Sequence, residues 1–222
     1  MKQSTLGISM VFIAMVSFMP LAKAQKKPFT GTIVYDVKSD DYTLQQANGV
    51  LTTEMTLKVS PDKLLQVWHS SVVDIKAIIN ASSQTEYVLM DMMGYKQCNK
   101  STAAEISDEN KKNGLVYTVK LTSDTKTIAG YNCKRAIVTV KSDQTGEQTM
   151  DVYFTDEIDV SKFYFGNVFP KVGGLPLEFS TKKGNTSLKT TAKSVKKEYI
   201  DETEFSIPAD YKIVTTEELR TK

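Results

Sequence analysis

The stretch KRAIVTVKSDQTGEQTMDVYFTD, residues 134–156, decides the fold class. It contains two runs, 134–142 and 147–156, in which apolar and polar side chains alternate, and the residues between them include Gly146, which permits a tight turn. Alternation with a period of two places the apolar side chains on one face of an extended strand. The stretch therefore predicts two neighbouring antiparallel strands joined by a turn.

The same alternation recurs along most of the chain. Further runs rich in Val, Ile, Thr and Tyr, which suit a pleated and half-buried surface, lie at 29–39, 52–60, 63–70, 72–80, 86–98, 115–122 and 187–200. A short polar helix or a loop is expected at 101–113, a second short helix at 160–165, and an irregular end from which Phe205 and Ile207 dock. The pattern predicts a mostly β fold: a strongly curved antiparallel sheet or half-open β-barrel of about eight to ten strands, with one or two short helices.

The first residues have the features of an export signal. A positively charged start precedes an uncharged, mostly apolar run at 6–19, and Ala22-Lys23-Ala24 is the small-x-small pattern that signal peptidases cleave. The run is shorter than the ~20 apolar residues that span a bilayer. We therefore expect a signal peptide at 1–24, cleaved near Ala24, and a single β-rich domain at 25–222 that is periplasmic or secreted and not membrane-spanning once processed.

The charge of the chain is balanced once this signal is set aside. The sequence holds 28 Lys+Arg and 26 Asp+Glu residues, and two of the positive charges, Lys2 and Lys23, belong to the expected signal peptide. The remaining chain has as many positive as negative side chains. This composition gives no support for nucleic acid as a partner.

Export also bears on the two cysteines of the chain, Cys98 and Cys133. Thiols outside the cytoplasm tend to be oxidised, and an even count indicates pairing. A reactive redox pair is more often closely spaced, as in C-x-x-C. We therefore expect one structural disulfide between Cys98 and Cys133, closing a loop of about 36 residues.

The sequence contains no frame for catalysis or metal binding. His69 is the one histidine, and neither a nucleophile motif nor partner ligands accompany it. Acidic clusters at 156–159 and 201–204 lack the spacing of a calcium loop and are expected in solvated turns. Lysines at 189, 193, 196 and 197 are expected to protect a sheet edge, with an anionic partner as the alternative. We predict no catalytic residue, no metal and no cofactor, and hence a protein that is not an enzyme.

One apolar segment stands apart. KFYFGNVFPKVGGLPLEFS, residues 162–180, combines many large apolar side chains with more Gly and Pro than a regular strand tolerates. Two interpretations are open: the segment fills the core, or it borders an apolar pocket. The candidate ligand-binding residues, which include methionines able to adapt to irregular ligands, are Phe163, Phe165, Phe169, Leu175, Leu177, Met90, Met92 and Trp68.

Three motifs carry a resemblance to a known family. TIAGYNCKRA at 127–136, YFTDE at 153–157 and GLPL at 174–177 resemble the signatures of an exported bacterial domain of unknown function related to the GLPGLI family. The resemblance implies a curved antiparallel sheet, similar to the half-open barrels of lipoprotein carriers of the LolA and LolB type. Those carriers shield acyl chains on a concave apolar face.

Three functions are therefore weighed. The first is a non-enzymatic periplasmic protein that binds an apolar ligand, such as a lipid or acyl chain, in a concave sheet. The alternative is an envelope structural or protein-interaction module without a small-molecule ligand, whose partner is another envelope protein. An enzyme, such as a hydrolase with acidic groups in a cleft, is the third and needs convergent carboxylates.

Overall fold

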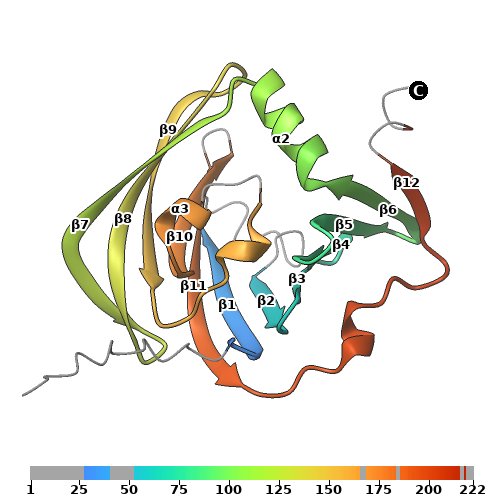
Figure 1. The fold of residues 1–222 in the computed structure, drawn as a ribbon, viewed down its shortest axis with the longest axis horizontal. Coiled ribbons are helices and arrows are strands. Elements are labelled where there is room, and N and C mark those ends of the chain that lie inside the picture. The colour runs from blue at the N-terminus through green and yellow to red at the C-terminus, as the bar shows by residue number, and fades with distance from the viewer. Residues whose placement is uncertain (1–27, 41–52, 166–168, 184–185, 216–217, 219–222) are drawn as a thin grey trace, which may run out of the picture.

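The computed structural model describes residues 28–40, 53–165, 169–183, 186–215 and 218, which form one curved sheet with a few short helices (Figure 1). The strands are β1 (Gly31–Ser39), β2 (Glu54–Val59), β3 (Lys63–His69), β4 (Val73–Asn80), β5 (Thr85–Met92), β6 (Tyr95–Thr102), β7 (Val116–Ile128), β8 (Tyr131–Ser142), β9 (Gly146–Thr155), β10 (Leu175–Lys183), β11 (Thr186–Lys197) and β12 (Lys212–Thr215). The helical elements are α2 (Ala103–Lys112), η1 (Ser161–Phe163), α3 (Phe169–Val172) and η2 (Glu202–Phe205). The predicted fold class, mostly β with a strongly curved antiparallel sheet, is confirmed.

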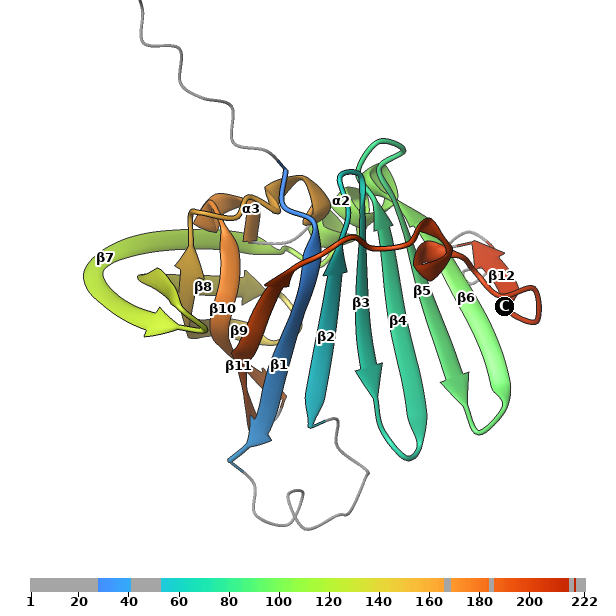
Figure 2. The same ribbon diagram turned by 90° about the horizontal axis from the view of Figure 1, so that it is seen from below.

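The sheet consists of two arms. Across the sheet the strand order is β12-β6-β5-β4-β3-β2-β1-β11-β10-β9-β8-β7. Strands β1 to β6 pair with their neighbours in sequence, as do β7 to β11, and the arms join where β1 pairs with β11. The opening stretch forms the hairpin of β8 and β9, as predicted, with Ser142 opposite Gly146 at the turn. Helix α2 links the two arms between β6 and β7 (Figure 2).

Irregular pairing bends the sheet into a trough. A bulge adds a residue to one strand and increases its local twist. The register shifts lie between Val34 and Tyr35 on β1, between Leu121 and Thr125 on β7, and between Pro176 and Glu178 on β10. In Figure 1 the sheet curves around η1 and α3, and α2 lies across its open side.

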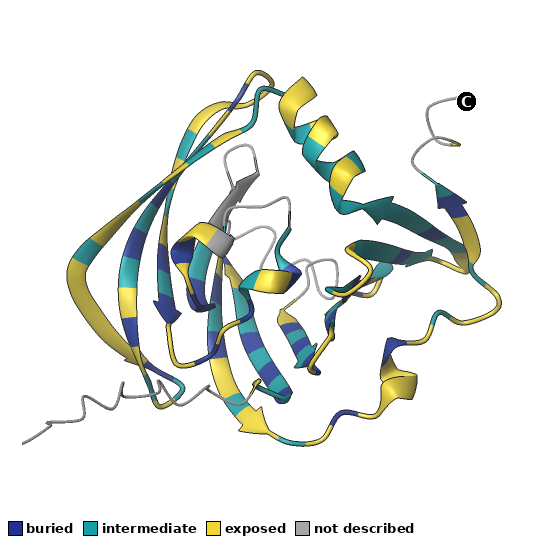
Figure 3. Ribbon diagram, viewed as in Figure 1, coloured by how far each residue is buried: buried dark blue, intermediate teal, exposed yellow. Residues whose placement is uncertain are grey.

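The two faces of the sheet belong to different cores. Leu64 and Leu65 are consecutive on β3 and both buried, and they point to opposite faces. The core on the Leu64 side lies inside the trough, and its residues include Ile33, Tyr35, Leu57, Ile79, Phe163 and Leu177. Figure 3 shows the resulting alternation of buried and less buried residues along β1 and β2.

The outer face of β3 to β6 is covered by the segment that follows β11. Ile200 and Phe205 are buried there in one cluster with Leu65, Ile78, Leu89 and Cys98, and Ile207 packs against it. The expected docking of Phe205 and Ile207 is thus confirmed. After this segment the chain forms β12, which pairs in parallel with β6 at the edge of the sheet and was not predicted.

The predicted disulfide is wrong. Cys98 on β6 and Cys133 on β8 are both free and buried. Cys98 belongs to the outer core and Cys133 to the core inside the trough. Their strands lie in different arms, separated by β5, β4, β3, β2, β1, β11, β10 and β9. Burial raises the pKa of the Cys133 thiol to about 11, so this side chain is a neutral core residue.

Part of the segment at 162–180 is a regular strand, contrary to expectation. Strand β10 begins at Leu175, and Pro176 lies beside the bulge, where proline is tolerated. The position before the strand requires a glycine, Gly174, because a Cβ atom there would lie 2.1 Å from the carbonyl oxygen of Thr155. The glycine therefore allows a close approach of two backbones rather than an irregular loop.

The lysine row does not protect a sheet edge, because β11 lies between β1 and β10. Two of its lysines pair with acidic side chains of the neighbouring strands instead. Lys189 contacts Glu178 at 3.2 Å, and Lys193 contacts Asp36 at 3.0 Å. The edge interpretation was wrong because sequence order does not reveal which strands end a sheet.

The expected signal peptide, residues 1–24, lies outside the described residues. Within the part of the chain that is described, no helix has the length and apolar character needed to cross a bilayer.

Candidate functional site

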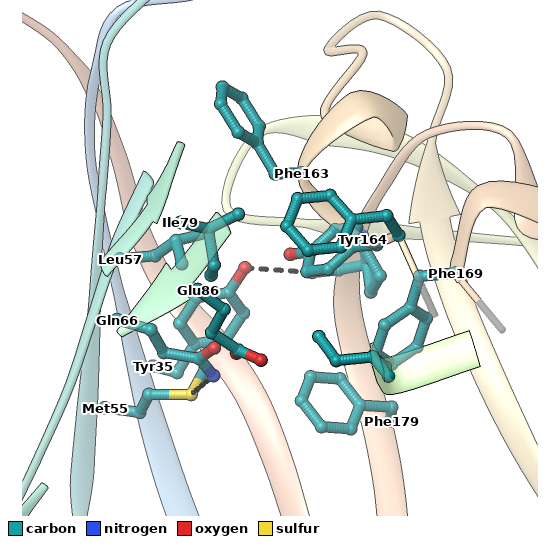
Figure 4. Close-up of a pocket in the computed structure, with 13 residues that line it drawn as sticks. Tyr35, Met55, Leu57, Gln66, Ile79, Glu86, Phe163, Tyr164, Phe169 and Phe179 are labelled. Carbon is teal, nitrogen blue, oxygen red and sulfur yellow. Dashed lines mark hydrogen bonds between the residues drawn. The ribbon is translucent and has the colours of Figure 1, made fainter. Parts of the chain in front are cut away.

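A partly enclosed cavity of about 330 Å³ lies inside the trough (Figure 4). It is bounded by the concave face of the sheet, by helix α2 and by the aromatic segment around η1 and α3. Its lining is mostly apolar, and consists of Tyr35, Met55, Leu57, Gln66, Ile79, Glu86, Ile106, Phe163, Tyr164, Phe165, Phe169, Pro176 and Phe179.

Cross-strand pairs form the floor of this pocket. Tyr35 on β1 lies opposite Met55 on β2, and Leu57 lies opposite Gln66 on β3. Ile79 on β4 lies opposite Glu86 on β5. Directly opposite residues of paired strands project from the same face, so the alternation of these strands places all of them toward the cavity.

Aromatic side chains form the opposite wall. Tyr164 and Phe169 meet edge to face with ring centroids 5.3 Å apart, and Phe169 meets Phe179 in the same way at 5.6 Å. Phe163 is buried against the core of the trough. Edge-to-face contacts stabilise the wall beyond simple burial.

Helix α2 closes the pocket from above through Ile106. The helix begins with a capping box, in which the Thr102 hydroxyl accepts from the Glu105 backbone N–H and the Glu105 side chain accepts from the Thr102 backbone. None of its residues is fully buried. Helix α2 is thus well defined at its start but packs only lightly on the sheet.

The polar groups of the pocket differ in how they are satisfied. The Tyr35 hydroxyl donates to the Pro176 carbonyl at 2.9 Å, and the Gln66 amide donates to the Met55 sulfur at 2.9 Å. Burial, with Tyr164 and Cys133 as smaller causes, raises the pKa of Tyr35, and burial raises that of Tyr164, so both phenols are neutral. Among the described residues, no hydrogen bond or ion pair reaches the carboxyl group of Glu86.

The residues predicted from sequence fall into three groups. Phe163, Phe165 and Phe169 line the cavity. Leu175 and Leu177 are fully buried in the core behind it. Leu175 and Leu177 therefore belong to the core and do not border the pocket, because their side chains have no surface left for a ligand.

The remaining predicted residues lie outside the cavity. Trp68 and Met90 are half-buried and continue the floor, since Met55, Trp68, Ile75 and Met90 oppose one another from β2 to β5. This row, here called the apolar strip, runs from the pocket toward β6. Met92 is 54% exposed near the tip of the β5–β6 hairpin.

Sequence reasoning missed the residues of the pocket floor on β1 to β5 and the lid, which is helix α2 with Ile106. The alternation at 29–39 and 52–60 predicted the strands that carry Tyr35, Met55 and Leu57, but it cannot say which strands face a cavity. Glu86 stands at the start of the apolar run EYVLM, and a charge there is the signal that was available. Ile106 is an apolar residue in the polar helix α2, which is a comparable signal.

The other polar groups have structural partners. His69 contacts Asp74 across β3 and β4 in an exposed position. The hydroxyl of the adjacent Ser70 is hydrogen-bonded within the turn, where it donates to the Val73 carbonyl at 3.0 Å. The described residues contain no group of three or more His, Cys, Asp or Glu side chains that could hold a metal ion.

The acidic clusters singled out in the sequence are likewise paired. Asp156 contacts Lys134 at 2.6 Å, and Asp159 accepts from the Ser161 backbone at 2.9 Å. Asp201 accepts from the Thr203 backbone at 2.9 Å and so caps η2. These carboxylates hold turns and helix starts, as expected for solvated turns.

Comparison with known proteins gives one family match. A family model described as "N-glycanase peptide, N-terminal domain" matches residues 82–214, which is more than half of the chain. This is not the GLPGLI family that the sequence motifs resemble. No curated protein matches the sequence.

Among solved structures, the chain is similar to LprF from Mycobacterium bovis. The likeness has a TM-score of 0.32 and 10% sequence identity, and it covers 75% of this chain and 85% of that one. A likeness this distant carries no argument about ligand or function.

Proposed function

The chain belongs to the family described as "N-glycanase peptide, N-terminal domain", and we propose that it is a non-enzymatic module that binds an apolar ligand inside its curved sheet. The observation that supports this proposal is the pocket between the concave floor, the aromatic wall and α2. Concave, mostly apolar pockets with a few polar groups are the usual form of small-molecule sites.

The size of the pocket limits what it encloses. A volume of about 330 Å³ is near the lower end of the ~300–1,000 Å³ that is typical of ligand sites. At ~30 Å³ for each non-hydrogen atom, the share of one molecule in liquid water, it holds roughly ten such atoms. The pocket therefore suits a short chain or one end of a longer one.

The apolar strip offers a place for the rest of a long chain. Trp68, Ile75 and Met90 are only half-buried, and they share the face of Met55. Covering them removes further apolar surface from water, at about 0.8 kcal/mol for each buried methylene of the ligand. A ligand that fills the pocket and follows the strip uses residues predicted from sequence together with those that were missed.

A glycan-cleaving activity is not proposed, although the family name is that of an N-glycanase. Hydrolysis of a glycan linkage, whether a glycosidic or an amide bond, requires several acid, base or nucleophile groups that converge on the scissile bond. Of the described residues that line the pocket, Glu86 is the one carboxyl group. The matched model is an N-terminal domain, and a supporting role beside an enzyme fits a single acid better than catalysis does.

A protein-interaction module is the second candidate, and exposed apolar side chains favour it. Met92, Met93 and Tyr95 are 54%, 89% and 71% exposed at the β5–β6 hairpin. Exposed apolar clusters often mark contact sites. In this interpretation the pocket stays empty and the hairpin contacts another protein of the envelope, where the signal peptide expected at residues 1–24 would direct the chain.

Native mass spectrometry after detergent-free purification tests the proposal. We expect an apolar adduct on the wild type and on the Ala104→Trp variant, because Ala104 is exposed on α2. The Ile106→Trp variant, which places an indole in the pocket from the same helix, should lose the adduct while it keeps its melting temperature within a few degrees. An adduct that survives in Ile106→Trp, or a wild type without any, would count against the pocket.

A further inference from the structure

The pocket contains a carboxyl group that nothing in the described chain neutralises. Glu86 stands near the start of β5, opposite Ile79 on β4 and Ser101 on β6. Its side chain is partly withdrawn from water, and this burial raises its pKa. Burial of a carboxylate costs free energy unless a charge or hydrogen-bond donor compensates it.

Elsewhere the fold does compensate such a group. Glu178 is 7% exposed, and it receives Lys126 at 2.8 Å, Lys189 at 3.2 Å and the Thr191 hydroxyl at 3.2 Å. Glu86 has no counterpart of this set among the described residues. The difference indicates that the partner of Glu86 comes from outside the described chain.

The surroundings of Glu86 offer acceptors and aromatic faces. The Gln66 amide donates one of its two N–H groups to the Met55 sulfur, a weak acceptor, and its oxygen is a further acceptor in the lining of the cavity. Figure 4 shows the Glu86 carboxyl and the Gln66 amide facing Phe169 and Phe179 across the cavity. Acidic oxygens together with aromatic faces are the groups that bind an organic cation.

We propose that the ligand carries a positively charged, hydrogen-bond-donating head, an ammonium group, which binds to Glu86 between the floor and the aromatic wall. This inference rests on the proposed function, since the apolar part of the ligand occupies the same pocket. A carboxylate head is disfavoured there, because it meets a like charge without a donor between them.

Short probes that differ only in the head test this inference. They are octylammonium, octyltrimethylammonium, octanol and octanoate, whose chains match a cavity for roughly ten non-hydrogen atoms. Isothermal titration of the full chain should rank octylammonium first, about tenfold tighter than octanoate, because a charge-assisted hydrogen bond adds to the shared burial of the chain. Octyltrimethylammonium keeps the charge but donates no hydrogen bond, and it should bind more weakly than octylammonium.

Two variants locate the effect. Glu86→Gln should lower the affinity for octylammonium about tenfold and leave that for octanol within a factor of about two. Glu147→Gln removes the same charge from an exposed position of β9 and should change neither. Unchanged affinity for octylammonium in Glu86→Gln would overturn the inference.

The remaining outcomes distinguish a failure of the ammonium head from a failure of the proposed apolar pocket. Equal binding of all four probes, or tighter binding of octanoate, contradicts the ammonium head but supports an apolar pocket. Equal binding of the two cations contradicts the hydrogen-bond donor. Failure of every probe to bind contradicts the proposed function itself.

Discussion

Ile79 and Glu86 lie directly opposite one another on β4 and β5, so that a buried isoleucine and a carboxyl group without a partner in the described chain share the floor of one pocket. A carboxylate at this place destabilises the folded sheet, because its burial is not compensated by a charge or a hydrogen-bond donor within the described chain. The ligand-free protein therefore carries an unfavourable free-energy contribution from Glu86, which leads to the first prediction.

Glu86→Gln should stabilise the ligand-free protein at pH 7, raising its free energy of unfolding by about 1 kcal/mol, because the amide is cheaper to bury than the carboxylate. The raised pKa of Glu86 means that the folded wild type binds its proton more tightly than the unfolded chain. The wild type therefore loses stability as pH rises through that pKa, and the gap to the variant should close below about pH 4, where both states are protonated. Urea unfolding at several pH values measures this, and a variant less stable than the wild type at pH 7 would be inconsistent with an uncompensated carboxylate.

The free thiols give a second prediction. Cys98→Ala and Cys133→Ala should each cost about 1 kcal/mol of unfolding free energy, and the double variant should show the sum, because the residues lie in separate cores. Reductant should not change the melting temperature of the wild type. If the two were bridged, the second substitution would cost much less than the first, and mass spectrometry of the denatured, alkylated chain would show no added alkyl groups.

The segment after β11, which covers the outer face of β3 to β6, gives a third prediction. Phe205→Ala should lower the free energy of unfolding by about 3–5 kcal/mol, because the ring is buried among Leu65, Ile78 and Leu89. Tyr199→Ala is the matched control, since Tyr199 is 81% exposed, and it should stay within about 0.5 kcal/mol of the wild type. Similar losses in both variants would show that this segment does not pack as described.

A fourth prediction concerns the hydrogen bond between Tyr35 and Pro176 in the lining of the pocket. Tyr35→Phe removes the hydroxyl that donates to the Pro176 carbonyl at 2.9 Å, and should cost about 1–2 kcal/mol of unfolding free energy. Tyr95→Phe changes the same group where the side chain is 71% exposed and should have no measurable effect. Equal stability of Tyr35→Phe and wild type would mean that this contact between β1 and β10, made across β11, contributes nothing to stability.

The strands were largely predictable because their alternation is local. The β8–β9 hairpin follows from residues 134–156 alone, whereas β10 was hidden by Gly174 and Pro176, whose roles depend on Thr155 and a bulge. The disulfide failed for a similar reason. Compartment and an even count favour pairing, but only the strand order reveals that β6 and β8 lie in different arms.

The pocket was predictable only in part. The aromatic segment was visible as a local excess of apolar side chains, and it does supply Phe163, Phe165 and Phe169. The floor depends on how the arms curve, and the lid depends on where α2 crosses them. Neither is encoded in a single short stretch, so Glu86 and Ile106 became interpretable only after the sheet was assembled.

The most direct test of the central claim, that the pocket takes an apolar ligand, is a methyl NMR titration of the full chain with octanol. The account predicts saturable shifts of the methyl groups of Ile79 and Ile106, and no shift at Ile213, which is 51% exposed on β12. Shifts confined to Ile213 and other exposed methyl groups, or an absence of saturable shifts at Ile79 and Ile106, would contradict it.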